Sequence, residues 1–264
     1  MSKGTNLISE IGKYFKENDA TSAMNKIMKI IRTLNFSEKR LFGEESRCNC
    51  KYSQLQVLQL LLLFPCFMIK NAFNYSTSSL CGIADCGKDV FYRFLSREDY
   101  DWRNILINIT TQLWRKTLAN TERDDKTPIC LMVDDTDYPK RGIQTEMIGK
   151  VFSHVEHKMI LGFKGLFLGI TDGATQMLMD FCLVGERGKN GMYNLKQKQL
   201  DARFTKERDK DSHTAKRIKE YDESKITLMI EMIKRLIARK IHFDYILADS
   251  WFACAEVIKF VTSR

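Results

Sequence analysis

Apolar residues recur at helical spacing through the first part of the chain. Two such stretches lie in residues 5–35, and the most apolar run extends from Leu55 to Ile69, where Pro65 should bend or end a helix. That run falls short of the roughly 20 apolar residues that span a bilayer, which favours a buried helix. Further helices are expected at 90–95 and 102–114. The region 1–125 is therefore predicted to be all-α.

The pattern changes after a polar linker at 120–128. Ile129–Val133 is a short continuous apolar run, which is typical of a strand buried on both faces. Asp172-Gly173 provides turn chemistry between two further apolar stretches, which predicts an antiparallel hairpin. The expected elements are strands at 129–133, 159–170, 176–184 and 243–248 and helices at 226–237 and 251–261. The region 126–264 is therefore predicted to be an α/β domain.

The charge balance favours a polyanionic partner. Lys and Arg total 42 against 33 Asp and Glu, which gives a formal net charge of +9 and favours nucleic acid as a partner. The basic excess flanks a nearly neutral block at 126–185. The segment 186–223 is dense in Lys and Arg and poor in large apolar side chains. It is predicted to be a surface insertion, either a solvated loop or a surface that contacts DNA phosphates.

Eight cysteines occur without a signal-peptide pattern at the start of the chain. Reduced thiols of a soluble, cytoplasmic protein with no membrane partner are therefore expected, rather than disulfides. Cys48-x-Cys50 and Cys81-x4-Cys86 lack the paired spacing and the nearby histidines of a zinc module. Core or surface thiols are accordingly favoured over zinc ligands.

Carboxylates close the first and the last predicted strands. Asp134 and Asp135 follow the strand at 129–133, and Asp249 follows the strand at 243–248. Taken alone, an Asp at a strand end is most often a turn or capping residue. Carboxylates at the carboxyl ends of adjacent parallel strands would meet in one crevice and repel each other unless a divalent cation lay between them. Oxygen ligands favour Mg²⁺ or Mn²⁺, and a pair of such ions can activate a water or a 3′-hydroxyl for phosphoryl transfer.

The residues around these carboxylates resemble a known family. Met132-Val-Asp-Asp-Thr136 and Tyr138-Pro-Lys-Arg-Gly142 resemble the first catalytic block of DDE transposases of insertion sequences, and Tyr245-Ile-Leu-Ala-Asp-Ser-Trp-Phe252 resembles the second. Segments at 153–158, 162–165 and 169–173 are also similar to this family. The resemblance covers most of 125–264. It implies an RNase H-like, mixed-sheet catalytic core of the cut-and-paste group whose third block carries Tyr, Arg, Glu and Lys.

The resemblance implies roles for individual residues. Asp135 matches the first catalytic and metal-binding carboxylate, because the family places that residue directly before Thr, and Asp249 matches the second. Asp134 competes with Asp135, but neighbouring side chains of a strand point to opposite faces, so only one of the two can face the metals. The implied cofactor is Mg²⁺ or Mn²⁺. The candidates for contact with DNA phosphates are Lys140, Arg141, Lys189, Lys196 and Lys198.

The family's third block has no match after Asp249. The expected catalytic core is therefore incomplete, truncated before the catalytic Glu and lacking the third metal ligand, so this chain alone should cleave DNA poorly. Glu256 is a weaker candidate for that ligand, because geometry rather than residue type decides a ligand.

The resemblance implies a transposase that cleaves insertion-sequence ends and joins them to target DNA as a homodimer in a synaptic complex. The helical region 1–125 would help to bind the terminal inverted repeats. A second interpretation is a truncated transposase that binds the element ends without catalysis and represses the intact enzyme. A stand-alone RNase H-like nuclease is a third, which the long basic insertion and the missing acidic residue disfavour.

Overall fold

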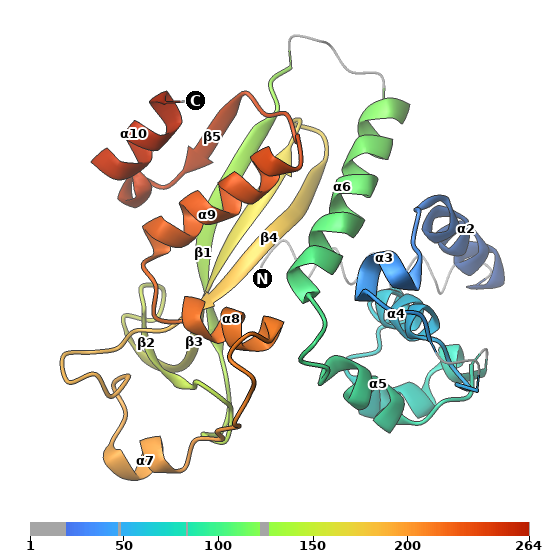
Figure 1. Ribbon diagram of the computed structural model, residues 1–264, viewed down its shortest axis with the longest axis horizontal. Helices are drawn as coiled ribbons and strands as arrows, with labels where there is room; N and C mark the ends of the chain where they lie inside the picture. Colours follow the sequence, from blue (N-terminus) through green and yellow to red (C-terminus); the bar gives the residue numbers. More distant parts are fainter. Residues whose placement is uncertain (1–19, 47–48, 83, 122–126, 264) are drawn as a thin grey trace. The chain divides into compact units, whose positions relative to one another are not determined.

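The computed structural model describes residues 20–46, 49–82, 84–121 and 127–263, and it divides into two compact units, Met1–Tyr100 and Asp101–Arg264 (Figure 1). The first helix expected within 5–35 and the thiol of Cys48 lie outside the described residues. The cysteines that the structure does describe are free thiols. None of the described helices is both long and apolar enough to cross a membrane.

The described part of the first unit is built from helices. Its elements are α2 (Ala20–Thr33), α3 (Glu38–Phe42), α4 (Gln54–Leu63), the 3-10 helices η1 (Ala72–Thr77) and η2 (Ser79–Gly82), and α5 (Lys88–Leu95). Ser53 caps the N-terminus of α4. Its hydroxyl accepts a hydrogen bond from Gln56 N, and the Gln56 side chain accepts one from Ser53 N. The most apolar run of the sequence thus forms a helix that ends at Leu63, before Pro65.

Aromatic side chains form the centre of the first unit. The ring centroids of Phe64, Tyr75 and Phe91 lie 4.7 to 5.7 Å apart, and Tyr75 and Phe91 are fully buried. The Tyr75 hydroxyl donates a hydrogen bond to the Ala84 carbonyl oxygen at 2.6 Å, which satisfies this polar group inside the core. Burial raises the pKa of the Tyr75 phenol. Aromatic packing therefore supplies the core for helices that are too short to be stable alone.

The second unit contains a mixed five-stranded sheet. Its elements are α6 (Trp102–Asn120), β1 (Cys130–Pro139), β2 (Gly149–Ser153), β3 (Lys158–Thr171), β4 (Gln176–Val184), α7 (Gln197–Asp201), α8 (His213–Glu220), α9 (Lys225–Ala238), β5 (Tyr245–Ala248), the 3-10 helix η3 (Ser250–Phe252) and α10 (Ala255–Thr262). β3 pairs antiparallel with β1, β2 and β4, and β1 pairs in parallel with β5. β1 therefore lies between β3 and β5, and the predicted hairpin is confirmed as β3 and β4.

Two parts of the sheet go beyond the expected strands. β1 continues to Pro139 rather than ending at Val133, because β3 offers it partners as far as Gly162. β2 pairs with the start of β3, and the local pattern of apolar residues did not indicate it. At Gly162 φ is +156°, and a Cβ atom there would meet the Tyr138 carbonyl oxygen. Glycine is therefore required at position 162, where one residue of β3 pairs with both β1 and β2.

Helices α6 and α9 pack on the sheet through one apolar core (Figure 1). Alternation along β1 turns Leu131 and Val133 to this face, and Leu168 of β3 lies opposite Val133. The other buried residues of this core include Ile107, Trp114, Leu166, Met232, Ile233 and Leu236. The helix expected at 226–237 is confirmed as α9, and burial of its apolar side chains holds it on the strands.

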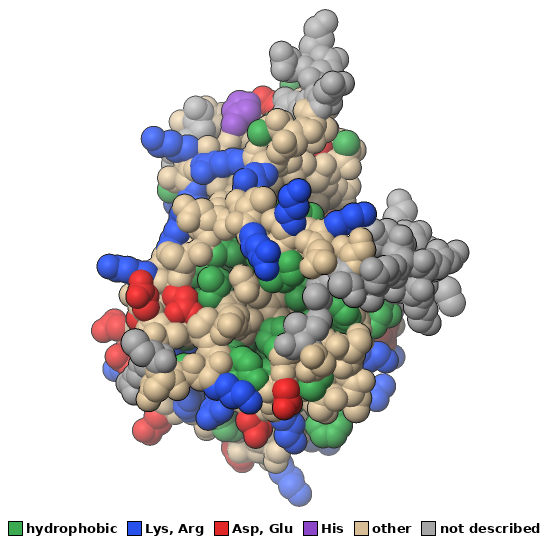
Figure 2. All heavy atoms as spheres, turned by 90° about the vertical axis from the view of Figure 1, so that its right-hand side faces the viewer, with side chains coloured by type: hydrophobic (Ala, Val, Ile, Leu, Met, Phe, Trp, Pro, Cys, Tyr) green, Lys and Arg blue, Asp and Glu red, His purple; other side chains and the backbone are tan. Residues whose placement is uncertain are grey.

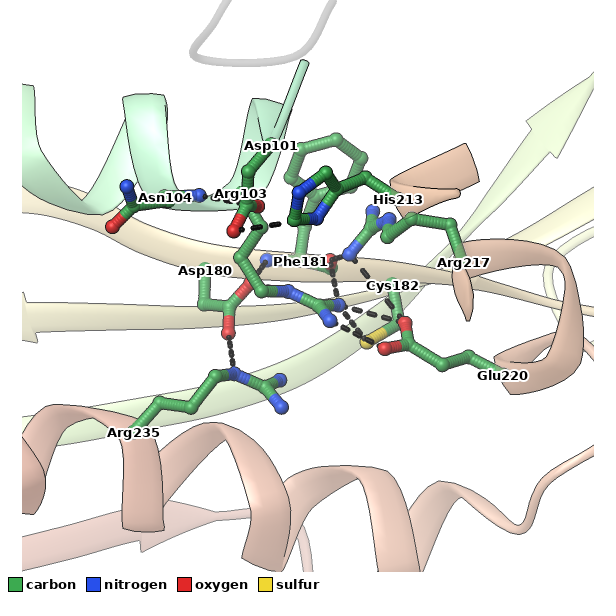
Figure 3. Close-up of polar contacts among 10 residues, drawn as sticks. All are labelled: Asp101, Arg103, Asn104, Asp180, Phe181, Cys182, His213, Arg217, Glu220 and Arg235. Atoms are coloured by element: carbon green, nitrogen blue, oxygen red, sulfur yellow. Dashed lines mark hydrogen bonds and ion pairs between the residues drawn. The ribbon is translucent and has the colours of Figure 1, made fainter. Parts of the chain in front are cut away.

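A buried carboxylate joins both helices to β4 (Figure 3). Asp180 is 1% exposed and stands opposite Leu168, so it points to the face that α6 and α9 cover. Its oxygens accept hydrogen bonds from Arg103 Nε of α6 at 2.9 Å and from Arg235 Nε of α9 at 2.8 Å. A buried charge is tolerated when it is paired and hydrogen-bonded. The two ion pairs therefore fix α6 and α9 against the same strand.

Arg103 also holds part of the basic segment 186–223. Both carboxylate oxygens of Glu220, the last residue of α8, accept hydrogen bonds from Arg103, one of them at 2.7 Å (Figure 3). Arg217 of α8 donates to the Phe181 carbonyl oxygen at 3.0 Å and lies over the Phe181 ring. The segment that was expected to be a surface insertion thus contains α7 and α8, and charged contacts hold α8 on β4.

Replacing Asp180 by Asn should lower the free energy of unfolding by about 3 to 5 kcal/mol, because Arg103 and Arg235 would lose the carboxylate that pairs them inside the protein. Urea denaturation followed by circular dichroism measures the change. Glu231→Gln is the matched control, since Glu231 forms an exposed pair with Lys234 on α9 and should matter by less than about 1 kcal/mol. Equal effects of the two substitutions would contradict the role of Asp180.

Glu220 should make the stability of the protein depend on pH. Burial raises the pKa of Glu220, but the hydrogen bonds and charge of Arg103 outweigh it, so the pKa lies below the ordinary 4.5. Such a carboxyl stabilises the folded state at pH values above its pKa in the unfolded chain, and that stabilisation is lost as the pH falls through its lower pKa in the folded protein.

The free energy of unfolding of the native protein should therefore fall more steeply below about pH 5 than that of Glu220→Gln, which has no titratable group at this position. Urea midpoints measured at a series of pH values give the two slopes. Parallel slopes would show that Glu220 does not carry this dependence.

Candidate functional site

The two carboxylates predicted to be catalytic belong to neighbouring parallel strands: Asp135 lies within β1, and Asp249 directly follows β5. In the register of β1 with β5, Val133 lies opposite Ala248. Asp135 is two residues past Val133, and Asp249 comes directly after Ala248. Because paired strands lie about 4.8 Å apart, this register brings the segments that carry both residues to the same end of the sheet.

Asp135 points to the face of β1 that carries Val133. Its side chain is 22% exposed, and its Oδ2 atom lies 3.1 Å from Lys225 Nζ and 4.0 Å from Lys164 Nζ. Lys225 is the first residue of α9, and Lys164 belongs to β3. One carboxylate oxygen therefore faces two ammonium groups that two other elements supply.

Asp134 points to the opposite face of β1 and is exposed. Its Oδ1 atom accepts a hydrogen bond from the backbone N–H of Asp135 at 2.8 Å. This orientation follows from alternation along the strand. Asp134 therefore lies apart from the two lysines that contact Asp135.

Asp249 is exposed and is the N-cap residue of η3. Its Oδ1 atom accepts hydrogen bonds from Trp251 N at 3.2 Å and from Ser250 Oγ at 3.0 Å. The Trp251 N–H is the main cause that lowers the pKa of Asp249, and the Ser250 hydroxyl adds to it. Capping thus holds the carboxylate at the end of β5 in its charged form.

Lys225 links the segment of Asp249 to Asp135. Its Nζ atom lies 4.5 Å from the centroid of the exposed Trp251 ring while it also contacts Asp135. Trp251 is the residue whose N–H binds the Asp249 carboxylate. The ammonium group of Lys225 therefore contacts both Asp135 within β1 and Trp251 in the segment that follows β5.

Lys164 and Asp137 complete this group of charges, and sequence reasoning missed both of them. Lys164 is 7% exposed, and its Nζ atom donates a hydrogen bond to Asp137 Oδ1 at 2.6 Å. Burial raises the pKa of Asp137, but the hydrogen bonds from Lys164 and Ser153 outweigh it and lower that pKa. Two signals were available: a lysine inside an apolar strand, and an Asp two residues past Asp135, which alternation places on the same face.

The candidates for contact with DNA phosphates are all exposed. Lys140 and Arg141 follow β1, and Lys189, Lys196 and Lys198 lie before and within α7. Figure 2 views the molecule from the right-hand side of Figure 1, the side away from α7, and shows other Lys and Arg side chains in the upper part of that face. Among the described residues, no hydrogen bond or ion pair joins any of the five candidates to Asp135 or to Asp249. Their charges face solvent, where a polyanion can reach them.

The oxygen atoms of Asp135 and Asp249 are ligands of the type that Mg²⁺ and Mn²⁺ prefer. Within the residues that the structure describes, no group of three or more Asp, Glu, His or Cys side chains is placed to hold a metal ion. Glu256, the weaker candidate for a third ligand, is exposed in the first turn of α10. Asp135 and Asp249 therefore fit a divalent cation in their chemistry, and a third protein ligand is not among the described groups.

Asp249 also borders an apolar groove of about 400 Å³ between β5, η3 and α10. Phe252, Val257 and Ile258 contribute to its wall, and Asp244 is its other acidic residue. The apolar lining suits packing more than charge, so the polar chemistry of the site is concentrated on the side of Asp135 and Lys225.

One known family matches most of the chain. A family model described as DDE superfamily endonuclease matches residues 77–264, which is more than half of the chain. The matched region contains every described element of the second unit, with both Asp135 and Asp249. No curated protein and no solved structure matches the chain.

Replacing Lys164 by Met should raise the pKa of Asp137, because burial would remain while the hydrogen bond and the positive charge of Lys164, which lower that pKa, would be lost. Carboxyl carbon NMR during a pH titration measures the change. Lys158→Met is the matched control, since Lys158 also belongs to β3 but pairs with the exposed Glu156. An unchanged titration of Asp137 in Lys164→Met would contradict the pairing.

Proposed function

This chain belongs to the DDE superfamily endonuclease family, and we propose on that basis that it is a DNA transposase which cleaves insertion-sequence ends and joins them to target DNA. The observation that carries the proposal is the position of Asp135 within β1 and of Asp249 directly after the adjacent parallel strand β5, inside the matched region. The order β4-β3-β1-β5, with only β5 parallel to β1, fits the RNase H-like core that we propose for this unit.

The proposed cofactor is Mg²⁺ or Mn²⁺, with Asp135 and Asp249 as the residues that hold it. Such an ion supplies a Lewis acid that activates an attacking hydroxyl and stabilises the leaving oxygen of a phosphodiester. Asp249 is prepared for this role by the hydrogen bonds from Trp251 and Ser250, which fix its Oδ1 atom. Lys225 and Lys164 balance the negative charge of Asp135 beside it.

The proposed substrate is DNA, both the terminal inverted repeats and the target. Endonucleases of this family act on phosphodiesters, and the net charge of +9 favours association with a polyanion. Lys140 and Arg141 are the proposed phosphate contacts nearest in the chain to Asp135, and Lys189, Lys196 and Lys198 the proposed contacts around α7. We further propose that the helical first unit helps to bind the repeats and that two copies act together in a synaptic complex.

A second candidate function is DNA binding without catalysis, in a protein that occupies the element ends and represses transposition. The observation that favours it is the lack, within the described residues, of a group of three acidic, His or Cys ligands for a metal ion. Two carboxylates hold a divalent cation less firmly than three, and a second ion needs more ligands.

Nicking of supercoiled plasmid DNA that carries the element ends, with Mg²⁺ or Mn²⁺, tests the catalytic role. Asp135→Asn and Asp249→Asn should each lower the rate by about 100-fold or more, because each removes a charged ligand of the cation. Asp134→Asn is the matched control, since Asp134 is adjacent in sequence but points to the opposite face of β1.

The outcomes separate the two candidate functions. Loss of nicking in Asp134→Asn with full activity in Asp135→Asn would overturn the assignment of the site. Salt-sensitive DNA binding by the native chain without any nicking would favour the repressor.

A further inference from the structure

Lys225 contacts both halves of the carboxylate site. Its Nζ atom lies 3.1 Å from Asp135 Oδ2 and 4.5 Å from the centroid of the Trp251 ring. Trp251 N in turn donates its hydrogen bond to Asp249 Oδ1. The ammonium group of Lys225 therefore lies beside the Asp135 carboxylate, where a divalent cation held by that carboxylate would also lie.

The two lysines beside Asp135 differ in how firmly they are held. Lys164 is buried and forms its shorter contact, 2.6 Å, with Asp137. Lys225 has a side chain that is 23% exposed, and Asp135 is the carboxylate with which it pairs. A partly exposed ion pair contributes little stability, and the flexible stem of lysine allows its ammonium to move between acceptors. Lys225 is therefore the lysine that can leave Asp135.

A DNA phosphate is a suitable second acceptor for Lys225. Lys225 is the first residue of the 14-residue helix α9, after the N-cap Ser224. The N-terminal end of a helix carries a partial positive charge that favours phosphate. The Trp251 ring beside the ammonium is 57% exposed, so this side of the site is open to solvent. A phosphate that reached α9 here would compete with Asp135 for the same ammonium.

We propose that Lys225 is a positioning residue that couples DNA binding to cation binding: a DNA phosphate draws its ammonium group away from Asp135, and the freed carboxylate then binds the divalent cation. This inference rests on the proposed function, in which Asp135 holds the cation. Because coupling between two binding sites is reciprocal, DNA raises the affinity for the cation by the same factor by which the cation raises the affinity for DNA.

The test measures Mn²⁺ binding by electron paramagnetic resonance of free Mn²⁺, with and without a short DNA duplex whose phosphorothioate linkages resist cleavage. Free DNA provides the blank for Mn²⁺ that binds to the duplex itself. For the native chain, DNA should raise the Mn²⁺ affinity about fivefold or more, which is the usual lower range of such coupling. In Lys225→Met, the Mn²⁺ affinity without DNA should already be higher than that of the native chain. Adding DNA should then leave the Mn²⁺ affinity of this variant nearly unchanged.

Two variants complete the test. Lys234→Met removes an exposed lysine of the same helix, which pairs with Glu231, and it should show the full gain of the native chain. Lys225→Arg keeps the charge and should retain part of the gain, which provides a folded comparison if Lys225→Met is unstable. A gain in Lys225→Met equal to that of the native chain would overturn the proposal, as would loss of the gain in Lys234→Met.

Failure of the underlying function would give a different result. If Asp135→Asn leaves Mn²⁺ binding unchanged, Asp135 does not hold the cation and the proposed active site is wrong. If Asp135→Asn abolishes Mn²⁺ binding while Lys225→Met preserves the DNA-dependent gain, the active site stands and the coupling through Lys225 is wrong.

Discussion

The parallel pairing of β1 with β5 is the constraint on which the carboxylate site depends. Four residue pairs, from Cys130 with Tyr245 to Val133 with Ala248, set the register of these strands. A shift by one residue would exchange the two faces of a strand, because side chains alternate. The core prevents such a shift in β1, since Leu131 and Val133 must stay under α9 and Asp135 must stay on the same face. The apolar packing thus decides which of two adjacent aspartates faces the lysines.

Helix α9 connects the two groups of charges that lie on this face of the sheet. Its first residue, Lys225, contacts Asp135, and Arg235 near its other end contacts the buried Asp180. Between them, apolar residues such as Met232 pack on the strands. The position of the Lys225 ammonium group beside Asp135 is therefore set partly by the ion pair of Arg235 with Asp180 further along the helix. A change at Asp180 would reach the site through α9 without touching any residue of the site itself.

The local pattern of apolar residues was sufficient to predict those elements whose apolar side chains are buried in the core. A continuous apolar run predicted the strand at 129–133, Asp-Gly turn chemistry predicted the hairpin, and helical spacing predicted the helix at 226–237. They occur as β1, β3 with β4, and α9. β2 and α8 could not be predicted in this way. β2 depends on pairing with β3, and α8 is held on β4 by the ion pair of Glu220 with Arg103, which is distant in sequence. The site was predicted as carboxylates alone for the same reason, because Lys225 and Asp135 come together only through the fold.

The pairing of Cys130 with Tyr245 also bears on how the protein is made. The two strands that carry the carboxylates are separated by the hairpin, the basic segment and α9. At typical rates of translation the ribosome needs roughly 6 to 23 s to add the intervening chain. The basic segment 186–223 is completed during that interval, so it is made after Asp135 and before Asp249. Synthesis therefore completes the segment proposed to contact DNA before it completes the pair of carboxylates proposed to cut it.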